Sequence, residues 1–382
     1  MQDSVLAIQG PPGTGKTYVS AEAIVSLVAS GRRVAVSSNS HRAIANLLKA
    51  VAEGAQKRGV TCRIAQKVSD AADAVEHPSV NVVRDNDAPE IATADVVGAT
   101  SWHFARYDEA AFDHLIIDEA GQVSLANVMA MSRAARNIVL VGDPMQLPQP
   151  IQGAHPGDSG LSSLEYLIGE HRAVPASKGI FLPTTRRLHD DVCAFISRAV
   201  YEGRLDNDPG ASAQMLLASD GTDIAGARIV DVPHSGRSQV SPEEVESVRT
   251  EIDSLLGATF VDREGATHVV EREHLIVVAP FNAQVNALKT ALGPDVKVGT
   301  VDLFQGQEAP ICIVSMTTSD GEEIPRGLEF LFSLNRINVA VSRAKISARV
   351  LASPALLDTP VRTVEQMKLA NTLCLLEEHG RR

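Results

Sequence analysis

The chain has 382 residues, 44% of them hydrophobic and 21% charged, and its formal net charge is −12. This composition is typical of a globular protein and excludes long disordered stretches, and the length favours two domains over a single core. The negative charge argues against a general nucleic-acid coat protein, because neutralising phosphates needs clustered Lys and Arg. A local groove that holds a short piece of backbone with hydroxyls, amides and a few arginines stays open.

No apolar run reaches the roughly 18 to 20 residues that a membrane span needs, and no basic and apolar leader follows Met1. We therefore expect a soluble, cytoplasmic protein with no membrane partner. The cysteines are scattered without a paired CxxC spacing, so neither a metal centre nor a disulfide framework is predicted, and packing is their expected role. They are Cys62, Cys193, Cys312 and Cys374.

The first part of the chain alternates short apolar runs with helical patterns. Strands are predicted at "VLAI", "RVAVSS", "DVVGATS", "HLIIDEAG" and "NIVLVGD", and helices at 16–30 and through "AIANLLKAVAEG". Continuous β-branched runs between helices indicate parallel strands buried on both faces, the α/β pattern. The Pro- and Gly-rich "PQPIQGAHPGDSG" is predicted to be a loop, followed by a helix at "LSSLEYLIG".

A second α/β series follows, from "GIFLP" through the helix at "SPEEVESVRTEIDSLLG" and the strands at "HLIVVAPF" and "PICIVSM" to "SARVLAS". The polar, Gly-rich region 206–227 is expected to be an exposed excursion. The prediction is an α/β protein with parallel sheets flanked by helices, divided into domains 1–172 and 173–382.

The segment "GPPGTGKT" fits the phosphate-binding pattern GxxxxGK[ST], and it follows a predicted strand and opens a predicted helix. In such a loop backbone N–H groups converge on phosphate oxygens, and the helix N-terminus adds partial positive charge. Lys16 is expected to reach the β and γ phosphates and Thr17 to ligate Mg²⁺, and the alternative is a Gly-rich turn without a ligand. The other predicted nucleotide-binding residues of the loop are Gly10, Gly13, Thr14 and Gly15.

The carboxylates after two later strands favour an NTP hydrolase. Asp118 ends a buried strand and is expected to hold Mg²⁺, and Glu119 is expected to orient or deprotonate the attacking water. In "VGDPMQLPQ", Gln146 is suited to contact the γ-phosphate or its water. The alternatives are two solvated acids and an ordinary turn. An Asn-Lys dipeptide, which a guanine-reading motif would need, is absent from the sequence.

These motifs resemble superfamily 1 helicases, in the branch typified by the nonsense-mediated-decay RNA helicase and its DNA-processing relatives. The resemblance extends in order along nearly the whole chain, and "FQGQE" followed by "NVAVSRAK" is its most specific part. Closer still, the chain resembles the helicase half of bacterial proteins that join a RecB-like nuclease to such a motor. The matching segments are "GPPGTGKT", "SSNSHRAIANL", "VVGATS", "DEAG", "GDPMQLP", "GLSSLEYLI", "TRRLHDDV", "YEGRL", "APFNAQVNAL", "TVDLFQGQEAPICIVSM" and "NRINVAVSRAK".

The resemblance implies two RecA-like domains that bind ATP between them and hold one nucleic-acid strand. It assigns Arg343 as an arginine finger for the γ-phosphate, a role worth about 10³ to 10⁵ in rate. Arg187 falls at a second γ-phosphate arginine, with Arg186 as the alternative register. Gly306 and Glu308 match the motif that couples nucleotide to strand, in which Glu308 resembles a sugar-binding acid.

The resemblance also implies contacts with strand phosphates by hydroxyl and amide groups. The candidates are Asn39, Ser40, Thr100 and Gln305. Four residues keep two interpretations each. Trp102 and Phe281 either stack on bases or pack in the core, Glu244 is a helix-surface acid or lies near nucleotide, and Arg336 is a salt-bridging arginine or faces an anion.

The predicted function is an ATP-dependent motor that moves along single-stranded DNA or RNA. The resemblance to nuclease-linked helicases favours DNA and implies travel in the 5′ to 3′ direction. The alternative is an NTP-gated regulatory switch without translocation, and a P-loop kinase is a weaker third. The adenine-reading Gln motif of the family has no counterpart before Gly10, so we expect a piece of a longer protein, with relaxed base selection as the alternative. Any nuclease activity would come from an N-terminal domain of that longer protein.

Overall fold

The structure, a computed structural model, describes residues 1–149, 153, 155–304, 306–321 and 324–380. Its contacts divide the chain into unit 1, Met1–Pro144 with Pro148–Leu182, and unit 2, Met145–Leu147 with Pro183–Arg382. This boundary lies after the predicted one at 172/173. The reason is that β8 (Gly179–Phe181) pairs in parallel with β1 (Val5–Gln9), which keeps the intervening segment in unit 1.

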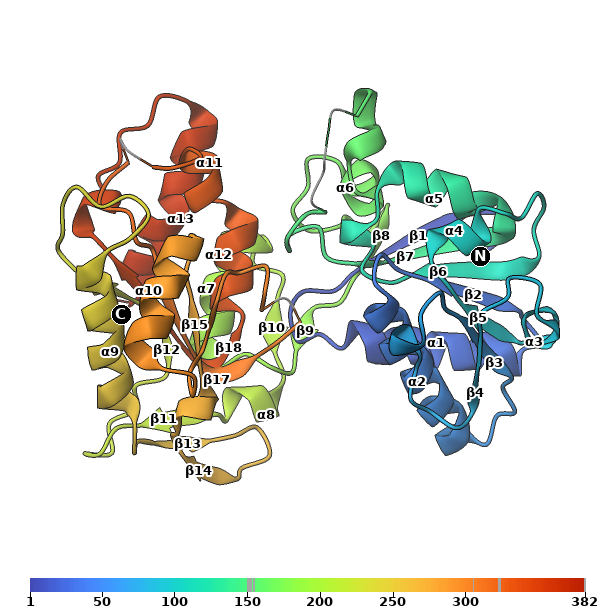
Figure 1. The fold of residues 1–382 in the computed structure, drawn as a ribbon, viewed down its shortest axis with the longest axis horizontal. Coiled ribbons are helices and arrows are strands. Elements are labelled where there is room, and N and C mark those ends of the chain that lie inside the picture. Colours follow the sequence, from blue (N-terminus) through green and yellow to red (C-terminus); the bar gives the residue numbers. More distant parts are fainter. Residues whose placement is uncertain (150–152, 154, 305, 322–323, 381–382) are drawn as a thin grey trace. The chain divides into compact units, whose positions relative to one another are not determined.

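Unit 1 is built on an eight-stranded sheet in the order β4-β3-β5-β2-β6-β7-β1-β8, and all its pairings are parallel (Figure 1). Its other strands are β2 (Val34–Ser37), β3 (Ile64–Lys67), β4 (Val80–Val83), β5 (Val96–Gly98), β6 (Phe112–Ile117) and β7 (Ala135–Gly142). Its helices are α1 (Lys16–Ala29), α2 (His41–Arg58), α3 (Pro89–Thr93), α4 (Ser101–Phe104), α5 (Leu125–Met131) and α6 (Ser163–Ile168).

Both faces of this sheet are buried, because successive residues of a strand point to opposite sides. Val34 and Val36 belong to the core cluster that includes residues of α1 and α2. Ala35, between them, belongs to the other cluster, which includes Met131 of α5 and Leu164 of α6. The continuous apolar runs of the sequence therefore correspond to strands covered on both sides.

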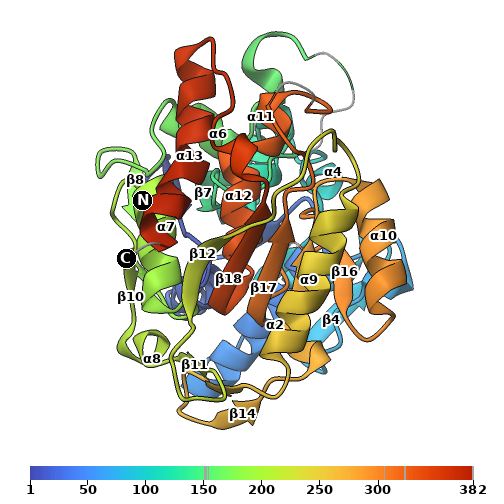
Figure 2. The same cartoon turned by 90° about the vertical axis from the view of Figure 1, so that its left-hand side faces the viewer.

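Unit 2 has a five-stranded parallel sheet in the order β12-β18-β17-β15-β16 (Figure 2). These strands are β12 (Gly226–Asp231), β15 (Leu275–Val278), β16 (Lys297–Gly299), β17 (Ala309–Ser315) and β18 (Ala344–Ala352). Its helices are α7 (Asp190–Val200), α8 (Pro209–Ser212), α9 (Pro242–Leu255), α10 (Asn282–Leu292), α11 (Leu328–Leu331), α12 (Leu334–Val341) and α13 (Val364–Gly380).

The two faces of the second sheet are also covered by different helices. Val277 and Ile313 pack with residues of α9 and α10. Val278 and Val314, one position further along each strand, line a small apolar cavity with residues of α12 and α13. The prediction of an α/β fold with parallel sheets flanked by helices is confirmed in each unit.

Several elements differ from the prediction. β3 and β4 were not predicted, and neither was α13. The expected excursion at 206–227 instead holds β10 (Asp206–Asn207), which pairs with β9 (Thr184–Thr185), and β11 (Met215–Leu217), whose Leu216 is buried. β11 joins β13 (Thr259–Val261) and β14 (Thr267–Val269) in an antiparallel sheet. Of the helices that the structure describes, none is long and apolar enough to cross a membrane.

Candidate nucleotide and nucleic-acid site

The phosphate loop of unit 1 connects the end of β1 to the start of α1, as the sequence predicts. Gly13 and Gly15 have φ angles of 77° and 78°, a left-handed conformation that favours glycine. Lys16 Nζ donates to the carbonyl oxygen of Gly10 at 2.8 Å. A Cβ on Gly10 would lie 2.3 Å from Lys16 Cγ, so glycine is required for this side chain to lie across the loop.

Thr14 and Thr17 are the two threonines among the predicted residues of the loop. The Thr14 hydroxyl donates to the carbonyl of Pro11 at 2.9 Å, which closes the turn before the helix. Thr17 is the second residue of α1 and is half-buried. The first N–H groups of α1 have no partner inside the helix, which suits an anion.

Asp118 lies directly after β6 and is buried. Its backbone N–H donates to the carbonyl of Ser37 at 2.8 Å, whereas its Oδ1 is buried without a hydrogen-bond partner among the described residues. The hydroxyls of Ser37 and Ser38 are likewise buried without a hydrogen-bond partner among the described residues. Burial and the neighbouring Glu119 raise the pKa of Asp118 to about 7, and Lys16 opposes them.

This arrangement fits a hydrated divalent cation. Buried polar atoms normally have hydrogen-bond partners. A bound ion or its waters would supply the partners that this carboxylate oxygen and these two hydroxyls lack. Mg²⁺ binds through few carboxylates and keeps several waters, which one acid and a threonine hydroxyl would allow. Glu119 has a φ of 51°, a conformation that is costly for this residue type and common at functional sites.

Gln9, a residue that the motifs did not reveal, holds Asp143, the acid that follows β7. Its Nε2 donates to Asp143 Oδ1 at 3.3 Å and to the carbonyl of Arg172 at 2.9 Å, and its Oε1 accepts from the N–H of Val174 at 2.7 Å. Gln9 is fully buried at the end of an otherwise apolar strand. A polar residue inside an apolar run was the signal that could have found it.

Gln146 follows Asp143 and is assigned to unit 2 with Met145 and Leu147. Asn335 Nδ2 donates to the carbonyl of Gln146 at 2.5 Å, and Asn338 Nδ2 donates to that of Met145 at 2.8 Å. Helix α12 thus holds the backbone of this turn. The predicted contact of the Gln146 side chain with a phosphate stays a prediction.

Unit 2 contains a cluster of three cations around one carboxylate. Arg187 Nε is ion-paired with Glu308, and Lys345 Nζ lies 3.0 Å from the other oxygen of Glu308. Burial would raise the pKa of Glu308, but Arg187, Lys345 and Arg343 outweigh it and hold it below its usual range. The excess positive charge of the cluster suits a polyanion such as a phosphate chain.

Arg343 is only 2% exposed. Its Nε donates to the carbonyl of Val339 at 2.9 Å, and its Nη1 donates to those of Phe304 and Gln307 at 3.2 and 2.8 Å. The guanidinium therefore joins the turn after α12 to the "FQGQE" loop. Gly306 of that loop has a φ of 78°, and Gln305 lies outside the described residues.

Arg336, on α12, has two structural partners. Its Nη1 lies 3.4 Å from Asp302 Oδ2, and its guanidinium carbon lies 4.3 Å from the centre of the Phe330 ring. The Phe330 ring in turn contacts Phe281 at 5.7 Å between centres, and Phe281 is buried. Of the two interpretations of Arg336, the structure favours the salt-bridging arginine. Of the two interpretations of Phe281, it favours packing in the core.

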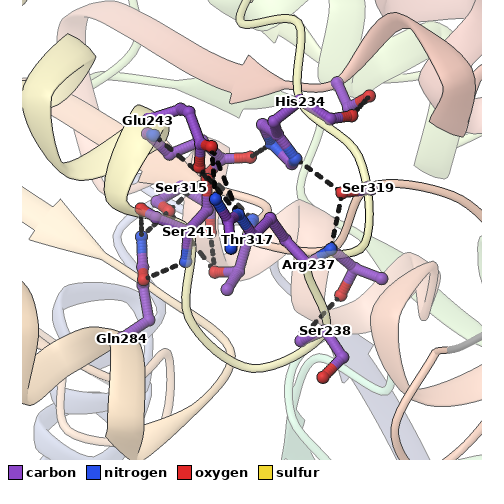
Figure 3. A network of polar contacts seen from close by, with 12 residues as sticks. His234, Arg237, Ser238, Ser241, Glu243, Gln284, Ser315, Thr317 and Ser319 are labelled. Carbon is purple, nitrogen blue, oxygen red and sulfur yellow. Dashed lines mark hydrogen bonds and ion pairs between the residues drawn. The ribbon is translucent and has the colours of Figure 1, made fainter.

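A buried polar network fixes the loops at the carboxyl ends of β12 and β17 in unit 2 (Figure 3). Glu244 is 0% exposed and accepts hydrogen bonds from His234 Nε2 at 3.0 Å, from the Ser315 hydroxyl at 2.5 Å and from the N–H of Thr317 at 2.8 Å. The other ring nitrogen of His234 lies 2.7 Å from the Ser319 hydroxyl. Of the two interpretations of Glu244, the helix-surface acid is therefore wrong.

The residues predicted to contact strand phosphates in unit 1 lie at neighbouring strand ends. β2 and β5 pair in parallel with Val36 opposite Gly98, so the segments that follow them are adjacent. Asn39 and Ser40 are exposed after β2, and Ser40 also caps α2. Thr100, half-buried, stands at the start of α4 after β5.

Comparison with known proteins gives the family. Two family models, each described as an AAA domain, match residues 160–355 and 1–158, and the first alone covers about half of the chain. The chain belongs to the AAA domain family. The two matches meet near residue 159, so one model covers most of unit 1 and the other covers most of unit 2.

Relatives in this family have helicase and DNA-binding names. The chain is 26% identical to DNA-binding protein SMUBP-2 of Mesocricetus auratus, over 99% of this chain and 43% of that protein. It is 24% identical to DNA replication ATP-dependent helicase/nuclease dna2 of Schizosaccharomyces pombe, over 91% of this chain and 26% of that protein. The chain thus spans less than half the length of these relatives.

A solved structure supports the fold. The complex of arterivirus nonstructural protein 10, a helicase, with DNA matches 92% of this chain and 60% of the viral chain, with a TM-score of 0.50 and 13% identity. At that identity the match concerns the fold alone, two RecA-like units of the P-loop type.

Proposed function

We propose that this chain is an ATP-driven nucleic-acid motor, a helicase or translocase of superfamily 1. The observation that carries the proposal is the buried Asp118 carboxylate, whose Oδ1 has no hydrogen-bond partner among the described residues and which interacts with Lys16 of the phosphate loop. It lies in a chain whose two units both match AAA domain models and whose relatives include a helicase/nuclease. A phosphate loop with a cation site and a catalytic acid hydrolyses nucleotide, and the second unit supplies the means to couple that reaction to movement.

We propose specific roles for the residues of unit 1. The loop Gly10–Thr17 cradles the phosphates of ATP, and Lys16 binds the β and γ phosphates. Asp118 and Thr17 hold Mg²⁺, which when bound neutralises charge on the phosphates. Glu119 accepts the proton of the attacking water, and its position one residue after Asp118 keeps it beside the phosphates.

The cationic cluster of unit 2 supports a role in turnover. Arg187 and Arg343 are proposed to act on the charge that develops on the phosphates, with Gln146 on the attacking water. Glu308 orients Arg187 and Lys345 through its two ion pairs, and Gly306 gives its loop the required turn. Arg343 donates to three carbonyls, two of which belong to the "FQGQE" loop. We therefore propose that nucleotide binding at Arg343 changes the position of this loop.

The proposed track is a single strand, DNA rather than RNA, travelled 5′ to 3′. The names of two relatives, a DNA-binding protein and a DNA replication helicase/nuclease, support DNA. Asn39, Ser40 and Thr100 are the proposed phosphate contacts in unit 1, with Gln305 in unit 2. We also propose kinship with bacterial proteins that fuse a RecB-like nuclease to a motor, with cutting carried out by an N-terminal nuclease domain of the parent protein.

The test is the ATPase rate with and without a single-stranded oligonucleotide, run in parallel with DNA and RNA at low salt. A motor requires a strong rise with at least one of them. Basal hydrolysis that neither strand stimulates would instead indicate a regulatory switch.

Two variants of the phosphate site test its assignment. Lys16→Ala should abolish nucleotide binding, because it removes the charge that holds the phosphates. Glu119→Gln should keep binding and lose turnover, because the amide cannot accept the proton. Nucleotide binding is followed with a fluorescent ATP analogue. Normal turnover in Glu119→Gln would contradict the assignment.

A further inference from the structure

Trp102 is the only tryptophan of the chain and is 85% exposed. Its exposure is the highest among the large hydrophobic side chains of the described residues. Exposed indole is apolar surface left in water, and tryptophan is enriched at binding interfaces, where its ring provides a large contact area. The sequence left packing and stacking open for this residue, and the structure removes packing.

The residues after Trp102 anchor its short helix α4 firmly. His103 and Phe104 are buried, and the His103 ring lies 3.0 Å from Asn86 Oδ1 through Nδ1. The Phe104 ring packs edge-on against Phe112 at 5.7 Å between centres, and the His103 ring packs against Tyr107 at 5.6 Å. The backbone that carries Trp102 is therefore fixed while its side chain faces solvent. Because the backbone is fixed, only the side-chain rotamers of Trp102 have to be ordered on binding.

The surroundings of Trp102 are polar and partly basic. α4 follows β5, which lies between β2 and β3 in the sheet, with strands about 4.8 Å apart. Asn39 and Ser40 follow β2, and Lys67 ends β3. Lys67 and Arg106 act on the nearby His103 and help to lower its pKa, after burial as the main cause. Arg106 is itself ion-paired with Asp87, so the basic charge near this strand end that has no ion pair among the described residues comes from Lys67. Strand ends with hydroxyls, an amide and an ammonium on either side of the one that carries Trp102 suit single-stranded nucleic acid better than an apolar protein surface.

We propose that Trp102 is a base-stacking platform for the single strand, with Asn39, Ser40, Thr100 and Lys67 facing the adjacent phosphates. This inference rests on the proposed function and adds the residue that grips a base rather than the backbone. Open α/β sheets bind ligands outside the carboxyl ends of their strands, and the Trp102 site lies at that edge. Stacking is tolerant of sequence, as a motor on arbitrary tracks requires.

The experiment compares two probes of equal length and charge, an oligothymidylate and an abasic deoxyribose-phosphate strand. The fluorescence of the single tryptophan should be quenched by the first and not by the second. Trp102→Ala should weaken binding of oligothymidylate by about 5- to 150-fold and leave the weaker abasic binding unchanged. Trp102→Phe should recover part of the loss. The matched control is Tyr166→Ala, another exposed aromatic of unit 1, which should leave both affinities unchanged.

Three outcomes overturn the inference. Unquenched fluorescence at saturation, with wild-type affinity in Trp102→Ala, would mean that no base contacts the indole. An equal loss for both probes would mean a contact with the backbone or a folding defect, and quenching by an added protein alone would mean a protein partner. In each case strand-stimulated ATP hydrolysis would still stand and preserve the proposed function. Failure of the wild type to bind either probe would remove both.

Discussion

Two adjacent acids at the start of α9 provide a sharp test of the buried network in unit 2. Glu244 is 0% exposed and accepts hydrogen bonds from His234, Ser315 and Thr317. Glu243, one residue earlier, lies at the surface and pairs with Arg237. Substituting each by alanine removes a carboxylate from the same helix turn in two different environments. The expected effects on stability differ accordingly.

The loss of unfolding free energy in Glu244→Ala follows from the buried donors that are left without an acceptor. An imidazole N–H, a hydroxyl and a backbone N–H lose their acceptor in the core, and each buried unsatisfied group costs about 1 to 3 kcal/mol. Since water can enter part of the cavity, we expect a total of about 3 to 5 kcal/mol, the range for breaking a buried charged pair. Glu243→Ala should have little effect, because solvent replaces the Arg237 contact.

Glu244→Gln separates size from charge. The amide keeps the volume and one oxygen, which can still accept from Ser315 and Thr317. Its nitrogen would then face His234, and the imidazole can accept from it by changing tautomer. We expect this variant to lie between Glu244→Ala and the wild type.

The assay is thermal unfolding followed by two probes. Backbone amide hydrogen exchange, resolved by peptide, reports on each unit separately, whereas far-ultraviolet circular dichroism reports on both units. For a unit of this size about 1 kcal/mol corresponds to roughly 2 to 4 °C, so Glu244→Ala should lower the Tm of the unit 2 transition by about 6 to 20 °C. A Tm equal to that of Glu243→Ala would refute the reasoning.

Three further predictions concern other buried polar residues. Arg343→Ala should lower both turnover and the Tm of unit 2, because three carbonyls lose their donor; loss of turnover at wild-type Tm would leave only the finger role. Gln9→Leu should destabilise unit 1 by about 1 to 3 kcal/mol in urea unfolding followed by peptide-resolved hydrogen exchange, and an unchanged midpoint would contradict its anchoring role. Burial, with Lys67 and Arg106, lowers the pKa of His103 to about 4. Between pH of about 6.5, the pKa in the unfolded chain, and pH of about 4, this side chain is protonated only in the unfolded chain, so unit 1 loses stability as the pH falls. His103→Gln should flatten the dependence of Tm on pH, and equal slopes in variant and wild type would contradict this role of His103.

The motifs and most strands could be predicted because their signals are local. A Gly-rich loop between a strand and a helix has one geometry, so Gly13, Gly15 and Lys16 lie where the sequence placed them. Buried parallel strands have continuous apolar runs, which identified β2 and β17. β3 and β4 were missed because runs of four residues that include polar side chains carry little signal.

The burial of polar side chains depends on contacts distant in sequence, and here the prediction was wrong or open. For Glu244 a helix-surface acid was one of two open interpretations, although it shares a helix face with Val248, Ile252 and Leu255, a spacing that could have revealed its burial. The carbonyl partners of Arg343 include Phe304 and Gln307, which sequence alone could not bring to it. The exposure of Trp102 depends on how its neighbours pack, which no spacing encodes.

The order of the strands in unit 1 places the two proposed sites next to each other along one edge of the sheet. The phosphate loop, Asp118 and Asp143 follow β1, β6 and β7, which are neighbours on one side of the sheet. The polar and aromatic residues around Trp102 follow β2, β5 and β3, which are neighbours on the other side. The two groups meet where β2 pairs with β6, and there the N–H of Asp118 donates to the carbonyl of Ser37, two residues before Asn39. If Asp118 shifts when phosphates bind, this hydrogen bond would carry the shift to the backbone before Asn39, the proposed strand contact.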